Sequence, residues 1–383
     1  MSRYSRIWST EIDHLKSVTP DHPVLYFSPE TLADTARRFR TGFPGLVTYA
    51  VKANDNPAVI DTLAQAGIRA FDVASPAEIA LVRAAVPGAA LHYNNPVRSR
   101  AEIDAAVEAD VASYSVDGPG ELAKLSGRVP EGREVSVRLA LPVPGAAYDF
   151  GAKFGEPPEG CVTLLQSVVE AGFTPAMTFH PGTQCTDPGA WGRYIETCAE
   201  VARQAGVRLS RLNVGGGFPS DRGKGAALEP IFAEIARATA LAFPDTPPRL
   251  VCEPGRAMVA ESFSLAVRVK ALRECGGLFL NDGIYGLLAE VPIMGPYARL
   301  RTVTSEGRPR NGAPHPRVLY GPTCDSLDRL PGEVGLPGDV DEGDFLIFDG
   351  MGAYSTATNT RFNGYGAHEI VTVRRGGHRA TQS

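Results

Sequence analysis

The chain has 383 residues, of which 43% are hydrophobic and 21% charged, and its formal net charge is −5. This composition is typical of a globular protein with one or two substantial hydrophobic cores. The acidic balance argues against the basic surface that nucleic-acid binding requires. No apolar run approaches the roughly 20 residues of a membrane-spanning helix. We therefore predict neither a nucleic-acid nor a membrane partner.

Cysteine and histidine usage argues against disulfides and metal sites. The six cysteines include no pair at CxxC spacing, and the seven histidines form no HExxH or HxH cluster. Scattered cysteines are typical of free thiols in a reducing compartment. The first residues contain no apolar segment of a secretory signal. We expect a cytoplasmic protein without a metal site, with Cys161, Cys198, Cys252 and Cys275 as small buried side chains.

Between residues 27 and 262, strand-like apolar runs alternate with helical patterns. The predicted strands are 46–53, 68–74, 90–94, 111–116, 134–141, 175–180, 211–215 and 249–253. The predicted helices include 57–66, 76–85, 101–109, 161–171, 191–205 and 230–243. About eight strand–helix units of this kind predict an α/β fold, a closed (β/α)8 barrel. A doubly wound open sheet is the alternative, but no GxGxxG motif follows the first strand.

After residue 262 the helical periodicity nearly disappears. Short β-type runs follow, separated by Gly, Pro and Asp: 263–272, 277–280, 299–303, 317–319, 345–348 and 370–373. This pattern favours a second, all-β domain. We therefore predict a barrel over residues 27–262 and a β domain over residues 263–383, with residues 1–26 packing on the β domain.

The most informative stretch is 48–54, an apolar run with Lys52 near its C-terminal end. Apolar residues on both sides suggest a strand that is buried on both faces. Burial disfavours the ammonium form of lysine, and an amine of lowered pKa is suited to Schiff-base chemistry with a carbonyl. A lysine that extends from a strand end into solvent is the alternative interpretation.

The ends of the other predicted strands carry further polar groups. In such barrels the active site lies at the C-terminal ends of the strands, and the loops after the seventh and eighth strands often bind phosphate. Here these loops are 215–219 and 253–256, in which glycines and an arginine suit an anion. Further strands contribute Asp72, Arg138, His180 and Glu253. A lysine, an imidazole, a carboxylate and a phosphate site are the groups that pyridoxal phosphate requires.

Over nearly its whole length the chain resembles the fold-type III pyridoxal-phosphate decarboxylases, the ornithine, lysine and diaminopimelate decarboxylase group. The matching motifs follow in the family's order: YAVKAN at 49–54, FDVAS at 71–75, KFG at 153–155, HPGT at 180–183, GGGF at 215–218, EPGR at 253–256, GPTCD at 321–325, GMGAY at 350–354 and RFNG at 361–364. The resemblance implies an alanine-racemase-like barrel, pyridoxal 5'-phosphate as cofactor, and a homodimer with shared active sites.

The resemblance also implies a role for each site residue. Lys52 would form the Schiff base, His180 would stack on the cofactor ring, and Glu253 would pair with the ring nitrogen. Cys324, contributed by the neighbouring subunit, would return a proton to Cα after carbon dioxide leaves. The phosphate would be held by Thr183, Gly216, Gly217, Gly255, Arg256 and Tyr354. Near the cofactor, Asp72 and Arg138 would orient other side chains, although Asp72 could instead cap a helix. Substrate-binding residues would be Asp325, Tyr285 and Glu290.

The substrate class is predicted from departures within these motifs. Asp325 after Cys324 resembles the ornithine and lysine enzymes, because diaminopimelate enzymes usually have glutamate there. Gln184 is reminiscent of the diaminopimelate enzymes, and Ile293-Met294 takes the place of a Tyr-Asp pair that binds the distal amine in ornithine enzymes. We predict decarboxylation of a basic L-amino acid of the ornithine or lysine type to its amine, a reaction of polyamine biosynthesis. The alternatives are a diaminopimelate-type or other modified amino-acid decarboxylase, an amino-acid racemase, and a non-catalytic regulator similar to the antizyme inhibitors.

Overall fold

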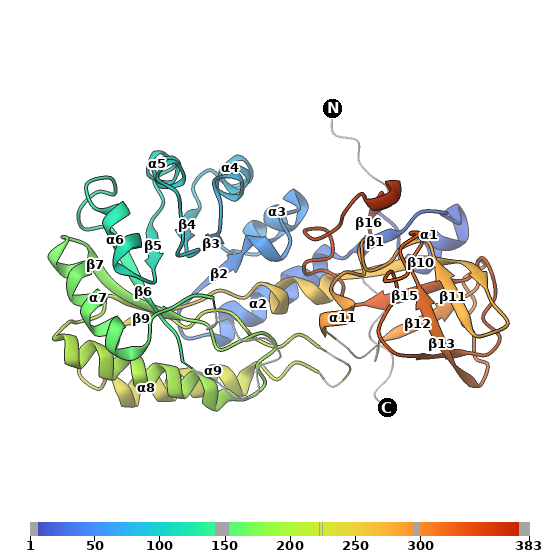
Figure 1. The fold of residues 1–383 in the computed structure, drawn as a ribbon. Helices are drawn as coiled ribbons and strands as arrows, with labels where there is room; N and C mark the ends of the chain where they lie inside the picture. The colour runs from blue at the N-terminus through green and yellow to red at the C-terminus, as the bar shows by residue number, and fades with distance from the viewer. Residues whose placement is uncertain (1–6, 142–152, 222, 224, 295–298, 375–383) are drawn as a thin grey trace. The chain divides into compact units, whose positions relative to one another are not determined.

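The computed structural model describes residues 7–141, 153–221, 223, 225–294 and 299–374 (Figure 1). These residues divide into two compact units. We call residues 35–219 and 226–258 the barrel unit, and residues up to 34, 220–225 and from 259 onward the β unit. The predicted domain boundaries at 27–262 and 263–383 stay predictions.

The barrel unit contains a closed parallel barrel, in which eight strands among the described residues pair in sequence order. Leu46 and Val47 of the first strand close the ring by pairing with Val251 and Cys252 of the last. Most strand residues are buried, as a parallel sheet covered by helices requires. The predicted (β/α)8 barrel is therefore confirmed. Its strands are β2 (Leu46–Ala50), β3 (Ala70–Val73), β4 (Ala90–Tyr93), β5 (Ser113–Val116), β6 (Glu134–Leu139), β7 (Thr174–Phe179), β8 (Arg211–Asn213) and β9 (Arg249–Cys252).

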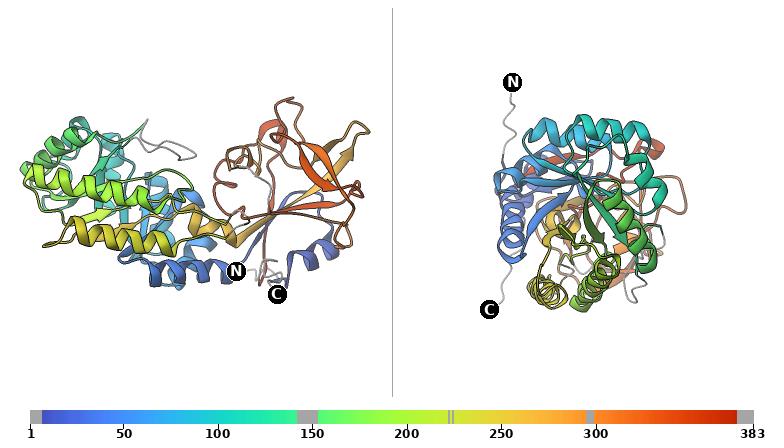
Figure 2. Two further views of the ribbon diagram at one scale, coloured as in Figure 1. Left: turned by 90° about the horizontal axis from the view of Figure 1, so that it is seen from below. Right: turned by 90° about the vertical axis from the view of Figure 1, so that its left-hand side faces the viewer.

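Helices surround the barrel as an outer layer, which the right-hand view of Figure 2 shows. Several of these helices begin at an N-cap residue that the sequence provides. Ser75 caps α4 by accepting the Glu78 N–H at 3.2 Å, and Ser99 and Glu102 form a capping box at α5. The helices are α2 (Pro29–Gly42), α3 (Pro57–Gln65), α4 (Pro76–Ala85), α5 (Arg100–Glu108), α6 (Pro119–Leu125), α7 (Pro158–Glu170), α8 (Pro188–Ala205), α9 (Glu229–Ala242) and the short α10 (Arg256–Val259).

Several barrel strands end earlier than the sequence predicts. β2 ends at Ala50, and Val51–Ala53 form a 3-10 turn, η1, instead of the end of a strand. β8 ends at Asn213 rather than at residue 215. The apolar pattern continues past these ends because Val51 and Val214 are fully buried in the turns. The residues that follow the strands therefore lie in loops at the C-terminal end of the barrel.

The β unit is built on a mixed sheet of eight strands within the described residues, which confirms the predicted β domain. The strands are β1 (Val24–Phe27), β10 (Phe263–Leu272), β11 (Gly277–Leu280), β12 (Leu300–Val303), β13 (Pro314–Tyr320), β14 (Val334–Pro337), β15 (Phe345–Asp349) and β16 (Glu369–Thr372). β1 pairs antiparallel with β10 and parallel with β16. Also present are α1 (Glu11–Val18), η2 (Ala260–Ser262), α11 (Val291–Met294) and η3 (Phe362–Gly364). The sequence predicted neither α1 nor β14.

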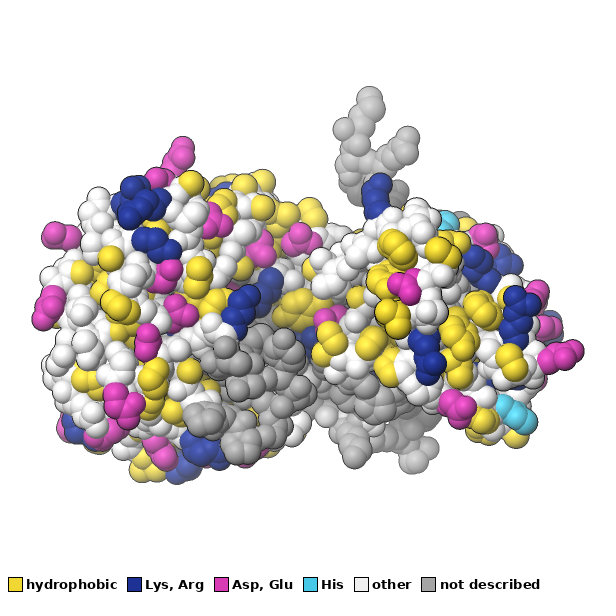
Figure 3. Space-filling model, in the orientation of Figure 1, with side chains coloured by type: hydrophobic (Ala, Val, Ile, Leu, Met, Phe, Trp, Pro, Cys, Tyr) yellow, Lys and Arg dark blue, Asp and Glu magenta, His cyan; other side chains and the backbone are white. Residues whose placement is uncertain are grey.

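Charged side chains of both signs are interspersed on the face of the molecule shown in Figure 3. This face therefore carries no large patch of one sign among the described residues. No helix in the described ranges combines the length and apolar character needed to cross a membrane.

An ionic contact fastens α1 to the sheet of the β unit. Arg301 on β12 binds Glu11 of α1 at 2.8 Å and Asp349 of β15 at 2.8 Å. Glu11 is only 1% exposed, so its charge depends on this contact for compensation. Leu15 of α1 packs beside it into the core around Tyr26.

We expect Arg301→Leu to lower the free energy of unfolding by about 3 kcal/mol or more, because it leaves two largely buried carboxylates without their cation. Arg128→Leu is the matched control, since Arg128 pairs with Asp104 at 2.6 Å on the surface; its cost should stay within about 1 kcal/mol. Urea unfolding of both variants measures the difference. Equal losses would contradict the interpretation.

Candidate active site

Polar side chains from most of the barrel strands gather at the C-terminal end of the barrel. Lys52 interacts electrostatically with Asp72, Glu78, His180 and Glu253. Arg138 interacts in the same way with Asp72, His180 and Glu253. The structure therefore brings together the predicted lysine, imidazole and carboxylates of the barrel. Their sources are η1 after β2, strand β3, strand β6 and the loops that follow β7 and β9.

Lys52 is exposed, which corrects the prediction of a lysine buried on a strand. The chain leaves the sheet at Ala50, so the η1 turn carries Lys52 beyond the buried strand. The turn is held by two contacts: Ala50 N–H donates to the Pro254 carbonyl at 3.3 Å, and the Tyr49 hydroxyl donates to the Asn54 carbonyl at 2.9 Å. Lys52 thus stands on a fixed turn beside a group of acidic side chains.

Glu253 accepts two amide hydrogen bonds at one carboxylate oxygen. Asn94, after β4, and Asn213, at the end of β8, both donate from Nδ2 to Glu253 Oε1. Burial raises the pKa of Glu253, and the Asn213 hydrogen bond, Lys52 and Arg138 oppose this rise. The sequence analysis did not identify the two asparagines, although Asn94 ends the predicted strand 90–94 and Asn213 lies within the predicted strand 211–215.

Asp72 is 5% exposed and lies close to Glu253. Burial first, and then the charge of Glu253, raise the pKa of Asp72 well above its ordinary value. The alternative interpretation as a helix cap does not hold at the helix that follows, because Ser75 caps α4 and Glu78 accepts the Ala74 N–H at 2.7 Å. Asp72 therefore belongs to the polar group inside the barrel.

The protonation of His180 follows from its contacts. Its Nδ1 accepts the Gly182 N–H at 3.1 Å, so Nδ1 carries no proton. Burial lowers the pKa of His180 well below its ordinary value, and the positive charges of Arg138 and Lys52 lower it further. The ring is therefore neutral, with its proton on Nε2.

The glycine-rich loop after β8 approaches its neighbours too closely for any side chain. A Cβ at Gly216 would lie 2.7 Å from the Glu253 carbonyl oxygen and 3.3 Å from His180 Nε2, and one at Gly217 would lie 2.2 Å from the Gly182 carbonyl oxygen. Gly217 also has a φ of +80°, which glycine adopts without strain. This loop, the loop with Thr183 and the loop before Arg256 thus meet beside His180 and Glu253.

The remaining predicted residues form a separate group in the β unit. The Tyr285 hydroxyl donates to Asp325 Oδ2 at 2.7 Å, and this bond lowers the pKa of Asp325. Cys324 donates to Asn363 Oδ1 both from its N–H at 3.1 Å and from its thiol at 3.2 Å. The buried Asp328 joins the two turns by accepting the Ile284 N–H at 3.0 Å and the Thr323 N–H at 3.0 Å.

Two further predicted residues lie elsewhere in the β unit. Glu290 precedes α11, and Tyr354 follows β15 with a left-handed φ of +63°. Of the cysteines predicted to be buried, Cys161, Cys198 and Cys252 are buried. Cys275 is exposed, which corrects that prediction, because it lies in the turn between β10 and β11.

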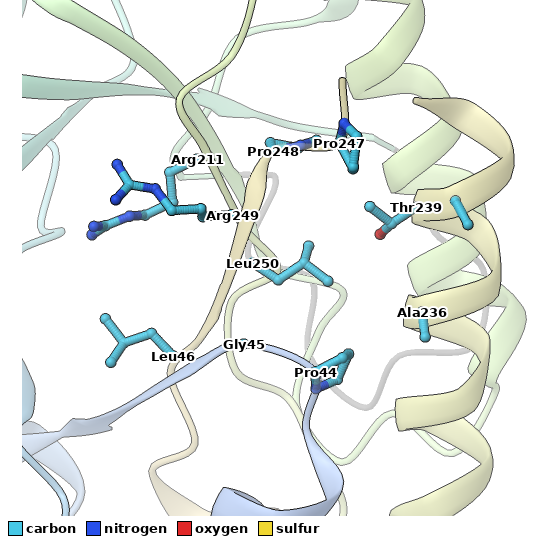
Figure 4. A pocket seen from close by; sticks show the side chains of 11 residues that line it. Pro44, Gly45, Leu46, Arg211, Ala236, Thr239, Pro247, Pro248, Arg249 and Leu250 are labelled. Carbon is cyan, nitrogen blue, oxygen red and sulfur yellow. The ribbon is translucent and has the colours of Figure 1, made fainter. Parts of the chain in front are cut away.

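A pocket of about 590 Å3 lies at the opposite, N-terminal end of the barrel (Figure 4). Leu46, Arg211 and Arg249, at the first positions of β2, β8 and β9, line it together with Thr239 of α9. Figure 4 shows the two arginine side chains pointing away from α9, and Arg211 pairs with Glu134 at 3.3 Å. Since barrel active sites lie at the C-terminal ends of the strands, this pocket is not the candidate site.

The residues at the C-terminal end of the barrel fit pyridoxal phosphate. The lysine can bind an aldehyde, the neutral imidazole can lie against a ring, and the buried carboxylate can accept a hydrogen bond from a ring nitrogen. The glycine loop, which a Cβ would fill, allows backbone N–H groups to approach a phosphate. Fold and site together define a barrel enzyme that uses pyridoxal phosphate.

Comparison with known proteins specifies the family. Residues 30–260 match the family model for the pyridoxal-binding domain of pyridoxal-dependent decarboxylases. The chain belongs to the pyridoxal-dependent decarboxylases. It is 31% identical to antizyme inhibitor 2 of Xenopus laevis, and the match covers 93% of this chain and 82% of that protein. It is 30% identical to lysine/ornithine decarboxylase of Selenomonas ruminantium, and this match covers 94% of this chain and 91% of that protein. The crystal structure of the Paramecium bursaria Chlorella virus arginine decarboxylase matches with a TM-score of 0.85 and 26% identity, over 94% of this chain and 98% of that one.

We expect the His180 imidazole to stay neutral from pH 8 to pH 6, because burial and two nearby cations hold its pKa well below 6.5. Nitrogen-15 NMR of histidine-labelled protein, with His180→Asn used to assign the signal, measures the protonation of each ring nitrogen. The Nε2 resonance should show an attached proton throughout this range. A His180 signal that titrates near pH 6.5 would contradict the geometry.

Proposed function

We propose that the chain catalyses the pyridoxal-phosphate-dependent decarboxylation of a basic L-amino acid to the corresponding amine. The observation that carries this proposal is the convergence of Lys52, His180 and Glu253 with the glycine loop at one end of the barrel. The names of the relatives favour a basic substrate, since they include lysine/ornithine and arginine decarboxylases.

The barrel residues would hold the cofactor. Lys52 would bind its aldehyde carbon covalently, the neutral His180 would lie against its ring, and Glu253 would accept a hydrogen bond from the ring nitrogen. When bound, pyridoxal phosphate withdraws electrons from the amino-acid Cα and so allows the bond to the carboxylate to break. Asp72 and Arg138 would orient the groups around Glu253. We assign the phosphate to Thr183, Gly216, Gly217, Gly255, Arg256 and Tyr354.

The β-unit residues would serve the substrate. We propose that Cys324 returns a proton to Cα after carbon dioxide leaves, in the active site of the neighbouring subunit of a homodimer. The bond from its thiol to Asn363 Oδ1 supports this role, because it orients the thiol. Asp325 would bind the distal ammonium of the substrate, with Tyr285 holding its carboxylate in place. Glu290 would add a second acidic group.

Two other functions fit the fold. A non-catalytic regulator is suggested by the similarity to antizyme inhibitor 2, but such a protein would be expected to lack cofactor residues, and Lys52, Glu253 and Arg256 are all present. A racemase uses a similar barrel but requires a second base on the opposite face of the ring, whereas the Cys324 motif is typical of decarboxylases. Release of carbon dioxide separates decarboxylation from both alternatives.

We expect lysine and ornithine to be the best substrates among ornithine, lysine, arginine and meso-diaminopimelate, with an amine as product. Asp325→Ala should lower kcat/KM for these substrates by about ten- to a hundredfold, because it removes a charge-assisted hydrogen bond to the ammonium. The control Asp245→Ala changes an exposed carboxylate and should leave kcat/KM unaltered. An uncharged or acidic amino acid as best substrate would overturn the basic-substrate proposal.

A composite site predicts complementation between two inactive variants. Lys52→Ala and Cys324→Ala homodimers should each be inactive, whereas their mixture should recover about a quarter of wild-type activity. Random exchange makes half of the dimers heterodimers, and each of these has one intact site. Subunit exchange is verified by native mass spectrometry. A mixture that exchanges subunits and stays inactive would contradict the shared site.

A further inference from the structure

Three side chains from three different barrel strands meet at a single oxygen atom. Asn94, in the loop after β4, and Asn213, the last residue of β8, both donate an amide N–H to Oε1 of Glu253, which follows β9. Asn213 is only 6% exposed. Because both bonds end on Oε1, the other carboxylate oxygen, Oε2, takes no part in this arrangement.

The orientation of the Asn213 amide is fixed by a second bond. Its Oδ1 accepts the Gly215 N–H at 3.0 Å, so the Nδ2 side of the amide has to face Glu253. The same bond fixes the start of the glycine-rich loop. Asn213 therefore links the turn of that loop to the carboxylate.

Asn94 stands on an equally constrained turn. Its carbonyl accepts the Ser115 hydroxyl at 2.8 Å. The guanidinium of Arg98, a residue only 2% exposed, donates to the carbonyls on either side, of Tyr93 at 3.0 Å and of Asn95 at 2.7 Å. A buried arginine held in this way leaves the loop little freedom to withdraw Asn94 from Glu253.

The two amides bind a carboxylate whose ionised form is disfavoured by its surroundings, because burial raises the pKa of Glu253. Glu253 lies close to the second carboxylate of Asp72, and both groups are penalised by burial when ionised. Lys52 and Arg138 oppose this penalty. An amide N–H bonds more strongly to a carboxylate than to a neutral carboxylic acid, so both hydrogen bonds favour the ionised form of Glu253.

We propose that Asn94 and Asn213 are positioning residues that hold Glu253 ionised and present it to the ring nitrogen of pyridoxal phosphate. This inference rests on the proposed pairing of Glu253 with that nitrogen. The alternative is that the amides only satisfy a buried carboxylate. A purely structural role of that kind would change stability but not the protonation of the ring nitrogen.

Asn213→Asp is the sharpest test, because aspartate has nearly the same shape and keeps an acceptor for the Gly215 N–H. It replaces the donor to Glu253 by a further acceptor. Asn94→Asp removes the other donor to Oε1, and with it the hydrogen bond between Asn94 and Asp72. Asn56→Asp is the matched control: Asn56 caps α3 through its side-chain oxygen, which accepts the Ala58 N–H at 2.9 Å, and aspartate serves equally well there.

The measurement uses the cofactor labelled with nitrogen-15 in its ring and bound to wild-type and variant protein. In wild type the solid-state NMR shift of the ring nitrogen should be that of a protonated pyridine. In Asn213→Asp and Asn94→Asp it should move toward that of an unprotonated pyridine, and the affinity of the apoprotein for pyridoxal phosphate should fall by about tenfold or more. The control should match wild type in both readouts.

Circular dichroism shows whether each variant folds, and a variant that does not fold is replaced by Asn94→Ala or Asn213→Ser. These changes remove or weaken the hydrogen bond to Glu253 without adding a carboxylate. They should move the shift of the ring nitrogen in the same direction. A ring nitrogen that is unprotonated in wild type, or unchanged in folded variants, would overturn the inference. The substrate class is tested separately, by the amine products that the enzyme forms. If that proposal is wrong, the shift of the ring nitrogen and the affinity for pyridoxal phosphate are unaffected.

Discussion

The arrangement of the polar groups in the barrel depends on a partly buried carboxylate, Glu253, at the C-terminal end of the closed parallel barrel. All eight barrel strands within the described residues run in one direction, so each delivers its last residues to the same end. Most strand residues are buried, and the charged groups of the site lie close to the C-terminal ends of their strands or just beyond them. Glu253 and Asp72 place two carboxyl groups there, and burial together with the charge of Glu253 raises the pKa of Asp72, so an ionised Glu253 requires compensation. Lys52, Arg138 and the two asparagines supply it.

The same constraint explains why the loops around the carboxylate are so closely packed. Gly216 leaves no space for a Cβ between the Glu253 carbonyl and His180 Nε2, so a change of residue there would move both functional groups. His180 in turn is held by a bond from the Gly182 N–H to its Nδ1, which settles its tautomer without any charged partner. A neutral imidazole beside Glu253 suits the cationic pyridine nitrogen that we propose Glu253 binds, because a cationic imidazole at that distance would oppose it.

Sequence reasoning identified the barrel, the β domain and most of the polar groups at the strand ends, because periodicity and helix caps such as Ser75 are local signals. It placed several strand ends too late, since an apolar residue such as Val51 is equally compatible with a buried turn. Asn94 and Asn213 were missed for a related reason: asparagine near a strand end is usually a turn former, and only the contact with Glu253, distant in sequence, reveals another role. Helix α1 was missed although Thr10 caps it, because a helix of eight residues also needs tertiary contacts, such as that of Glu11 with Arg301.

The residues proposed for the cofactor and those proposed for the substrate differ in their surroundings, and this difference bears on specificity. The groups proposed for the cofactor lie mainly in the barrel unit, where close mutual contacts make Glu253 and Gly216 hard to change alone. The proposed substrate groups, Asp325 and Cys324, lie in the β unit on turns that are joined by Asp328 and are more open to solvent. A substitution at such a turn disturbs fewer packed neighbours than one at Gly216 or Glu253. The chemistry of the cofactor can therefore be retained while the distal group of the substrate varies, which fits a family whose members are named for lysine, ornithine and arginine.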